Sequence, residues 1–369
     1  MYILPVDDAA ADALFHKVPA QIYAGDPRWT PHLRSDVEAV FDRRRNPYFG
    51  HGDAQRWVLH DARNCLLGRI AAFYDTRQDG IGGTGFFECI DDPAAAALLF
   101  DTARDWLTAQ GCRGMDGPVN FGERDRFWGL LVESSIDMPF QQVYHPAYYR
   151  ALFEGYGFEP LFQQYFYRYM LRQPLPAVFQ RLADRLVQQG GYHTRSLQGT
   201  SMAQSIDAFV EVYNQAWGAQ PAHRQVDRAQ ISAIFRSLRP ILDPATCWFA
   251  YHDTRPVAML VMLPEINQIR RHLHSDQMGW WQQAQFLWHR WRGTCRRLIV
   301  LVMGIVPAYQ RRGVESLLLT QAQARLQAQG RYDEVVAAWI GDFNAPMNGM
   351  MAKAGAVRVA RATTYRKAW

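Results

Sequence analysis

An internal duplication restricts the fold of this chain more than any other feature of its sequence. Three pairs of short segments match in the same order along the two halves. The pairs are Trp57–Arg63 with Trp248–Arg255, Leu107–Gly111 with Leu326–Gly330, and Gly157 plus Tyr167 with Gly355 plus Tyr365. Ordered self-similarity of this kind is typical of two related folding units. The sequence therefore predicts two α/β units, residues 1–173 and 174–369, that meet near the proline-containing stretch Arg172–Pro176.

The spacing between matches differs in the two halves and so locates two insertions. Between the first and second pairs the C-terminal half is longer, and we place the extra residues after Asn267. Between the second and third pairs the N-terminal half is longer, and we place those residues after Asn120. Each half is thus expected to be a common core with one insertion of its own.

Bulk composition fits a folded protein of two domains. The chain has 369 residues, of which 49% are hydrophobic, and a net charge of +5, so a large core is expected and a nucleic-acid partner is not required. Five cysteines without CxxC spacing argue against a disulfide framework and favour a reducing cytoplasm. The first residues lack a basic segment followed by an apolar run, so we expect neither a leader nor a membrane span.

The segment Gln310–Glu315 has the layout of a turn that cradles phosphate. It follows the β-branched apolar run Leu298–Val306 and precedes the helix-period stretch Ser316–Gln329. Backbone N–H groups between a strand and a helix start can converge on one anion, and the helix dipole adds to the attraction. Arg311 and Arg312 supply charge, and Gly313 permits close approach of the backbone. An ordinary basic turn would share this composition, so the context on both sides matters.

That context resembles the GNAT superfamily of acyl-CoA N-acyltransferases, whose pyrophosphate loop follows a strand that ends in an apolar-x-Pro sequence. The resemblance begins at Ile305–Gly313 and continues through the apolar run Glu334–Ile340, Asn344 and Met351–Gly355 to a last strand with Tyr365. It implies two tandem GNAT-like units, each a mixed, mostly antiparallel sheet flanked by helices. The chain as a whole also looks like a group of uncharacterised bacterial tandem-GNAT proteins.

The resemblance implies roles for individual residues. The thioester of acetyl-CoA or a longer acyl-CoA would lie along Met303, Gly304, Ile305 and Val306. The phosphates would bind at Gln310, Arg311, Arg312, Gly313, Val314, Glu315 and Ser316, and Asn344 would contact the pantetheine arm. Glu265 is our candidate base for a small-molecule amine acceptor, and Tyr365 our candidate acid for the leaving thiolate. An exposed turn carboxylate and a core aromatic are the respective alternatives.

Two positions depart from the pattern. Glu315 stands where the family has a small residue, and its carboxylate would repel a pyrophosphate. We expect it to turn away, held by backbone N–H groups or by Arg311 or Arg312. Met351 replaces the Tyr with which many relatives protonate the thiolate.

The first half has no equivalent loop. Asp91 and Asp92, followed by Pro93, occupy the corresponding position, and two carboxylates would repel a pyrophosphate. We interpret them as a helix cap rather than a metal pair. Histidines such as His16, His60 and His223 have no metal-ligand spacing, so no metal site is predicted.

Residues 269–297 interleave arginine with tryptophan. One interpretation is a helical hairpin over the open sheet face of the second unit, with aromatics inward and arginines solvated. The others are a lid over an acyl or amine pocket and attachment to an anionic membrane surface. Single-stranded nucleic acid would suit the same composition, although other basic clusters are lacking.

The sequence thus predicts an acyl-CoA-dependent N-acyltransferase with an unidentified amine acceptor. A non-catalytic CoA or acyl-CoA binding protein is the first alternative, favoured by Met351 and Glu315. An aminoacyl or peptidyl transferase of the tandem-GNAT type is the second. The sequence does not predict the oligomeric state.

Overall fold

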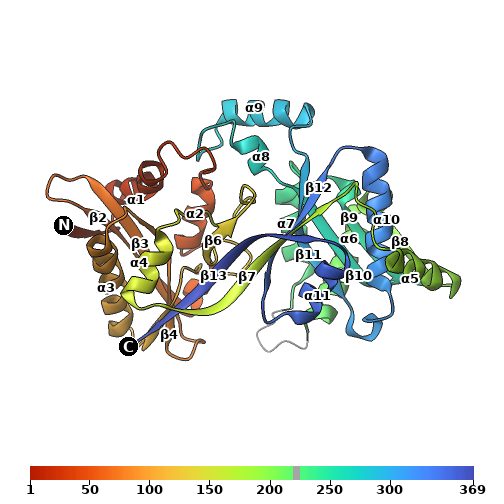
Figure 1. Cartoon of the computed structure of the whole chain (residues 1–369), viewed down its shortest axis with the longest axis horizontal. Coiled ribbons are helices and arrows are strands. Elements are labelled where there is room, and N and C mark those ends of the chain that lie inside the picture. The colour runs from red at the N-terminus through yellow and green to blue at the C-terminus, as the bar shows by residue number, and fades with distance from the viewer. Residues whose placement is uncertain (219–224) are drawn as a thin grey trace.

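Among the described residues, one mixed sheet of thirteen strands extends through the molecule, and its strands are seen in Figure 1. The computed structural model describes residues 1–218 and 225–369, so His223 lies outside the described residues. The strands are β1 (Tyr2–Pro5), β2 (Gly52–His60), β3 (Leu66–Asp75), β4 (Ile81–Cys89), β5 (Gly114–Gly117), β6 (Leu130–Ser134), β7 (Glu159–Met170), β8 (Tyr192–Ser196), β9 (Cys247–His252), β10 (Arg255–Pro264), β11 (Arg297–Ile305), β12 (Glu334–Gly341) and β13 (Val357–Ala368).

Helices cover both faces of this sheet. In the first half they are α1 (Ala9–Ile22), α2 (Arg34–Phe41), α3 (Pro93–Ala109) and α4 (Tyr149–Tyr156). In the second they are α5 (Ala177–Gln188), α6 (Met202–Trp217), α7 (Arg228–Leu238), α8 (Asn267–Arg270), α9 (Trp280–Trp291), α10 (Val314–Gln329) and α11 (Ala345–Lys353). The predicted class, a mostly antiparallel sheet flanked by helices, is confirmed.

Strand order shows the duplication directly. The sheet runs β1-β2-β3-β4-β5-β13-β7-β12-β11-β10-β9-β8, with β6 paired to β13. Read inward from either edge, three antiparallel pairings are followed by one parallel pairing, β4 with β5 and β11 with β12. Trp57 on β2 and Trp248 on β9 each lie on the second strand from an edge, as the matched segments predict.

The two halves exchange their last strands at the centre of the sheet. The strand β7 of the first half pairs with β12 of the second, and β13 of the second half pairs with β5 of the first. These two long strands also pair with each other and cross the middle of the molecule side by side (Figure 1). Each half therefore contains a strand that the other half encodes.

Local sequence explains how the matched helices begin and end. Asp92 caps α3 by accepting hydrogen bonds from the N–H groups of Ala94 and Ala95, with Pro93 in the first turn, so the predicted cap is confirmed. The matched helix α10 begins instead after Gly313, whose φ of 95° is readily accessible only to glycine. Corresponding helices thus start with opposite chemistry in the two halves.

Apolar clusters fill both faces of each half. In the first half one cluster packs under α3 and α4 and others under α1 and α2. In the second half the clusters lie under α5 and α10 and under α6 and α7. All five cysteines are free. Among the described residues, no helix combines the length and the apolar character needed to cross a lipid bilayer.

The predicted orientation of the insert is wrong. The insert is helical, but α9 packs on α8 and lies at the top of the molecule, outside the sheet (Figure 1), and its tryptophans face solvent. Two of its arginines, Arg270 and Arg297, are buried instead of solvated. They donate hydrogen bonds to the backbone oxygens of Pro31 and Asp137 in the first half. The insert therefore joins the two halves, a contact that its own periodicity does not encode.

The strand exchange predicts that neither half folds alone. Residues 1–173 lack β13, which lies between β5 and β7, and residues 174–369 lack β7, which lies between β12 and β13. Each fragment would leave long unpaired strand edges. We expect each fragment to show no cooperative thermal transition by circular dichroism, and co-expression to restore one. A monomeric fragment that melts cooperatively by itself would contradict the exchange.

Candidate active site

The strands β11 and β12 separate at the centre of the second half. They pair in parallel only from Arg297 to Val300 of β11. Beyond that point β12 stays with β7 and β11 stays with β10, as far as Ile305. The edge of β11 that faces β12 is therefore open from Leu301 onward, and backbone groups there can bond a ligand. Met303, Gly304 and Ile305 lie on this open segment, whereas Val306 follows it and donates its N–H to Val257.

The predicted phosphate turn lies directly after the open segment. Its backbone reverses through positive φ angles at Arg311 (59°) and Gly313 (95°). The first helical hydrogen bond of α10 runs from the N–H of Leu317 to the oxygen of Gly313 at 3.1 Å. The N–H groups at the start of α10, those of Val314, Glu315 and Ser316, therefore precede the helical ladder. With the exposed Arg311 and Arg312 beside them, they fit a phosphate-bearing ligand.

Gly313 is required by space as well as by conformation. A Cβ atom at this position would lie 3.3 Å from the Cβ of Leu182 on α5. Helix α5 therefore braces the turn from behind, and any side chain at 313 would strain the turn that presents the N–H groups.

Glu315 does not have the partners that we expected for it. Its Oε2 atom is buried and makes no hydrogen bond within the described part of the chain. Neither Arg311 nor Arg312 forms an ion pair with it there; the guanidinium of Arg312 instead lies over the ring of Tyr309. A carboxylate oxygen without a partner beside the phosphate turn opposes binding of an anion.

Asn344 is the N-cap of α11 and Met351 lies within that helix, which follows the end of β12. Asn344 caps this helix by accepting a hydrogen bond from the N–H of Met347 at 3.3 Å, and its side chain is exposed. Its amide N–H groups stay available for a ligand, so the predicted pantetheine contact remains a prediction. Met351, in the same helix, has no acidic proton to give.

Glu265 is buried at the junction of the halves and not at an access route. Its Oε1 accepts hydrogen bonds from the N–H groups of Phe140 and Asn267, each at 2.9 Å, and only 1% of the residue is exposed. Its own N–H donates to Arg297, at the start of β11. Arg297 and Met303 are roughly 20 Å apart at about 3.3 Å per strand residue. The structure therefore does not bring Glu265 to the predicted thioester segment.

Tyr365 lies in the core of the first half. Its hydroxyl donates to Glu154 Oε1 at 3.0 Å, and its ring packs beside Phe153 on α4. The strand exchange carries it there, because this part of β13 pairs with β5 and with the start of β7. The alternative of a core aromatic fits these contacts better than the acid role.

A loop of the first half reaches the gap between β12 and the open part of β11, from Leu301 onward. We call this gap the wedge. The Nε1 of Trp339 on β12, beyond the point of separation, donates to the backbone oxygen of Arg124 at 2.8 Å. Residues 121–127 therefore lie over the far end of β12. The insertion after Asn120 was predicted from segment spacing, but its position on the other half could not be.

Helix α6 covers the same face of the wedge. A Cβ atom at Gly304 would meet the ring of Trp217 at 2.5 Å, so that indole packs directly on the β11 backbone. Tyr213 stacks on Trp217 with 4.9 Å between ring centroids. Burial raises the pKa of Tyr213, and the nearby carboxylates of Glu123 and Asp125 raise it further. The loop and α6 thus approach each other over β11 and β12.

Asp125 is an accessible carboxylate in a recessed position. More than half of its side chain is exposed, 56%, and its Oδ1 lies 3.7 Å from Nε of Arg126. Surrounding protein nevertheless displaces enough water to raise its pKa, and Glu123 raises it further while Arg126 lowers it. Its backbone oxygen accepts a hydrogen bond from Gln142. A carboxylate that ligands can reach and that holds protons more tightly than usual suits proton transfer.

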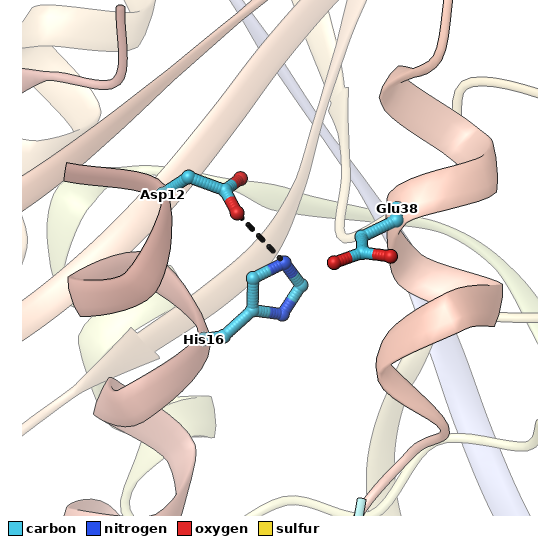
Figure 2. Close-up of side chains that lie close together, drawn as sticks. All are labelled: Asp12, His16 and Glu38. Carbon is cyan, nitrogen blue, oxygen red and sulfur yellow. Dashed lines mark ion pairs between the residues drawn. The ribbon is translucent and has the colours of Figure 1, made fainter. Parts of the chain in front are cut away.

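A second cluster of titratable groups lies in the first half, where Asp12, His16 and Glu38 converge (Figure 2). Their potential ligand atoms lie within 4.8 Å of one another. Arg34, however, donates to Asp12 at 3.1 Å and to Glu38 at 2.8 Å, and Arg56 reaches Asp12 at 2.6 Å. Burial lowers the pKa of His16 to about 4. Guanidinium groups already neutralise both carboxylates, so the cluster is built as an ion-pair network.

No model of a protein family matches the sequence. The chain is 24% identical to Bacterial ceramide synthase from Caulobacter vibrioides (strain NA1000 / CB15N) over 379 residues, which cover 99% of this chain and 97% of that protein. It is 28% identical to Protein YghO from Escherichia coli (strain K12), with 96% of this chain and 92% of that protein covered.

Solved structures share the fold. A tandem GNAT protein from the clavulanic acid biosynthesis pathway superposes with a TM-score of 0.56 at 12% identity, covering 100% of this chain and 98% of that one. A GCN5-related N-acetyltransferase from Sphaerobacter thermophilus gives 0.52 at 12% identity, covering 99% and 95%. The predicted tandem GNAT fold is thereby confirmed.

The phosphate turn predicts an asymmetric response of the two halves. Gly313→Asp adds a side chain against Leu182 and a negative charge at the N-terminus of α10, so we expect CoA binding to weaken at least about 100-fold. Asp91→Asn, at the matched position of the first half, should leave the affinity within about twofold. Calorimetric titration with CoA measures both, and unchanged affinity in the Gly313 variant would remove the turn from the site.

The burial of Glu265 should make the stability of the folded protein depend on pH. Burial raises its pKa above the usual 4.5, although Arg297 and Arg271 oppose the shift. The folded protein then binds this proton more tightly than the unfolded chain does. The resulting contribution to the free energy of unfolding is complete below the unfolded pKa and is lost as pH rises through the raised one.

Glu265→Gln keeps an oxygen for the two backbone N–H groups and removes the charge. We expect its stability at pH 7 to match or exceed that of the wild type, by up to about 2 kcal/mol, and to decline less between pH 4 and 7. Urea unfolding at several pH values provides the measurement, with the exposed Glu133→Gln as control. Parallel pH profiles of wild type and variant would show that Glu265 carries no strained charge.

Proposed function

We propose that this protein is an acyl-CoA-dependent N-acyltransferase whose acceptor is a long-chain amine carried in membranes. The observation that supports it most is the open edge of β11, which leads directly into a turn of positive φ at the N-terminus of α10. An open strand edge followed by a phosphate cradle suits an acyl donor with an amide-containing arm and a diphosphate.

In this proposal the second half binds the acyl donor. Backbone groups of Met303, Gly304 and Ile305 bond the arm and polarise the thioester carbonyl. The N–H groups at the start of α10, together with Arg311 and Arg312, hold the phosphates. Asn344 contacts the arm from the other side of the wedge. The donor supplies the activated acyl group, and the chain length that it carries is left open.

The class of acceptor is suggested by the relative named Bacterial ceramide synthase. A ceramide is the fatty amide of a long-chain amino alcohol, so its synthesis joins an acyl group to an amine. We transfer that substrate class to this chain as part of the proposal. Membrane attachment through residues 269–297, one of the interpretations of that segment, would be compatible with such an acceptor, because long-chain amines reside in lipid bilayers.

The first half completes the acceptor side. Its loop 121–127 and helix α6 flank the wedge, and Asp125 is an accessible carboxylate of this loop. The other exposed carboxylate there, Glu123, accepts a hydrogen bond from the hydroxyl of Tyr48 at 3.0 Å. We assign Asp125 as the base in place of Glu265, because Glu265 is buried, is bonded by two backbone N–H groups and lies at the far end of β11. The two halves thus divide donor binding and acceptor activation between them.

The reaction then proceeds by direct transfer. Asp125 takes the proton from the amine, whose nitrogen forms a bond with the thioester carbon. The backbone N–H groups of β11 stabilise the developing oxyanion. The C–S bond breaks, and the thiolate takes a proton from solvent, because Met351 cannot supply one.

A non-catalytic acyl-CoA binding protein is the second candidate. The unpaired Oε2 of Glu315 beside the phosphate turn favours it, since a repelling carboxylate weakens binding of a diphosphate. An assay that measures binding and turnover separately distinguishes the two functions, because the second candidate binds acyl-CoA without release of thiol.

Incubation with a long-chain acyl-CoA and a long-chain amino alcohol tests the proposal. Mass spectrometry should detect the amide, and a thiol reagent should detect one free CoA for each amide formed. Asp125→Asn should lower kcat about 100-fold or more while the affinity for CoA changes little. Glu133→Gln, in the same insert but paired with Arg361 on the sheet, serves as the matched control.

The pH profile gives a second readout. Asp125 must be deprotonated to act, and its pKa is raised above the usual 3.8. Activity should therefore fall on acidification at a higher pH than an ordinary Asp would give, and this limb should be absent from the residual activity of Asp125→Asn. If the wild type bound acyl-CoA but formed no amide, the enzymatic function would be rejected. If Asp125→Asn kept the wild-type kcat, the role of Asp125 as the base would be rejected.

A further inference from the structure

Helix α9 (Trp280–Trp291) is attached to the protein by one side only. Its Phe286 is buried in a small cluster with Ile269 and Leu273 of the preceding segment. Phe140 of the first half and Ile241, which follows α7, pack against the same cluster. The rest of the helix projects from the top of the molecule (Figure 1).

The outward side of α9 is apolar and aromatic. Trp280 and Trp291 are 80% and 83% exposed, and Trp281, Leu287 and Trp288 are also exposed. Positions 280, 287, 288 and 291 recur at the spacing of one helix face. Four tryptophans of one short helix in contact with water are costly, because each keeps a large apolar surface hydrated. We therefore expect this face to be covered by a binding partner.

Positive charge surrounds this apolar face. No acidic residue occurs between positions 277 and 293. An open hollow of about 590 Å³ at the C-terminal end of α9 is lined by Leu287, Arg290, Trp291, Arg292, Gly293 and Arg331. Among the described residues, Arg331 is paired with Asp243 at 3.1 Å, whereas Arg290 and Arg292 have no acidic partner. The guanidinium of Arg292 lies over Trp288, 4.6 Å from the ring centroid.

Indole rings beside guanidinium groups without acidic partners match the chemistry of a lipid interface. Arg290 donates a hydrogen bond to the backbone oxygen of Leu242 at 3.2 Å. Tryptophan prefers the level of the head groups, where its ring meets acyl chains and its N–H meets water. Arginine bonds lipid phosphates in two-point geometry. A protein partner would match the apolar face but not the arginines, and a single nucleic-acid strand would need phosphate contacts along an extended groove. Helix α9 is instead a short ridge with an arginine-lined hollow at one end, which suits a membrane surface.

We propose that α9 docks this protein on an anionic lipid membrane, with its tryptophan face in the head-group layer and Arg290 and Arg292 on lipid phosphates. The helix lies along the surface, since its 12 residues are too few to cross the bilayer and include three glutamines and Arg290. The use of this surface to reach a lipid amine rests on the proposed function, whereas the docking itself does not.

The position of α9 relates the docked surface to the wedge. The first-half insertion contributes Phe140 beneath α9 and Arg124 beside Trp339. The segment after α7 contributes Ile241 beneath α9, and α7 packs on α6, which covers β11. The first-half insertion, and α7 with the segment that follows it, thus connect the surroundings of α9 with the acceptor side of the wedge.

Flotation with vesicles tests the docking. Vesicles of phosphatidylcholine alone and of phosphatidylcholine mixed with phosphatidylglycerol are compared at low and physiological salt. The full-length protein should bind the mixed vesicles, and bind them less as salt rises. The double variant Trp280→Ser, Trp291→Ser removes rings that are more than three-quarters exposed, and should bind at least about tenfold less. Ile234→Ser, an exposed apolar residue on α7, is the matched control.

Charge reversal separates the electrostatic part. Arg290→Glu with Arg292→Glu should weaken binding to the mixed vesicles at least about tenfold, while Arg181→Glu, an exposed arginine on α5, should have little effect. Calorimetry with CoA checks that all variants keep a folded second half. Any of three results would overturn the proposal. These are no binding of the wild type to vesicles, equal binding of the wild type to both vesicle types, and undiminished binding of the tryptophan variant. Amide formation in solution by the tryptophan variant would leave the proposed function standing.

Discussion

The pairing of β7 with β13 is the contact on which the rest of the molecule depends. Both neighbours of β7 are strands of the second half, β12 and β13, and the strands that pair with β13, namely β5, β6 and β7, all belong to the first half. This arrangement fixes the distance between the two insertions, because each is anchored to strands of the shared centre. It places the first-half loop against Trp339 of β12 and the second-half insert against Pro31 and Asp137. The candidate site is thus composed of parts that only the exchange brings together.

The duplicated halves have diverged at matching positions. In one, Asp92 satisfies the N-terminus of α3 with its own carboxylate; in the other, Gly313 leaves the N-terminus of α10 open. The carboxylate of Asp92 already bonds the first N–H groups of α3 and opposes the positive end of the helix dipole, so a second anion would not bind well there. The first half thus has no open helix start at this position, and it supplies the loop with Asp125. The fold is shared, and the chemistry is set by single residues at equivalent turns.

Features encoded within a few neighbouring residues could be predicted from the sequence. The matched segments, the turn at Gly313 and the cap at Asp92 are of this kind. Glu265 shows the limit, because its burial depends on Phe140, far away in the other half. Tyr365 shows it too, since only the exchange carries that residue into the first-half core. Helical spacing indicated that the tryptophans of α9 share a face, but spacing does not state whether that face is turned toward protein or away from it. Nothing in the charged run around Asp125 distinguishes it from a solvated loop.

The order of synthesis adds a constraint on how this chain reaches its native state. Strand β13 emerges from the ribosome after every other strand of the sheet, yet it is the direct neighbour of β5, which emerges early. The first half must therefore wait for most of translation with an incomplete sheet and an exposed edge, a state in which nascent chains are vulnerable to aggregation. We therefore expect folding of this chain to benefit from chaperones. The late pairing of β13 also means that the wedge is assembled only after the whole sheet has closed, so no partly made chain carries a finished site.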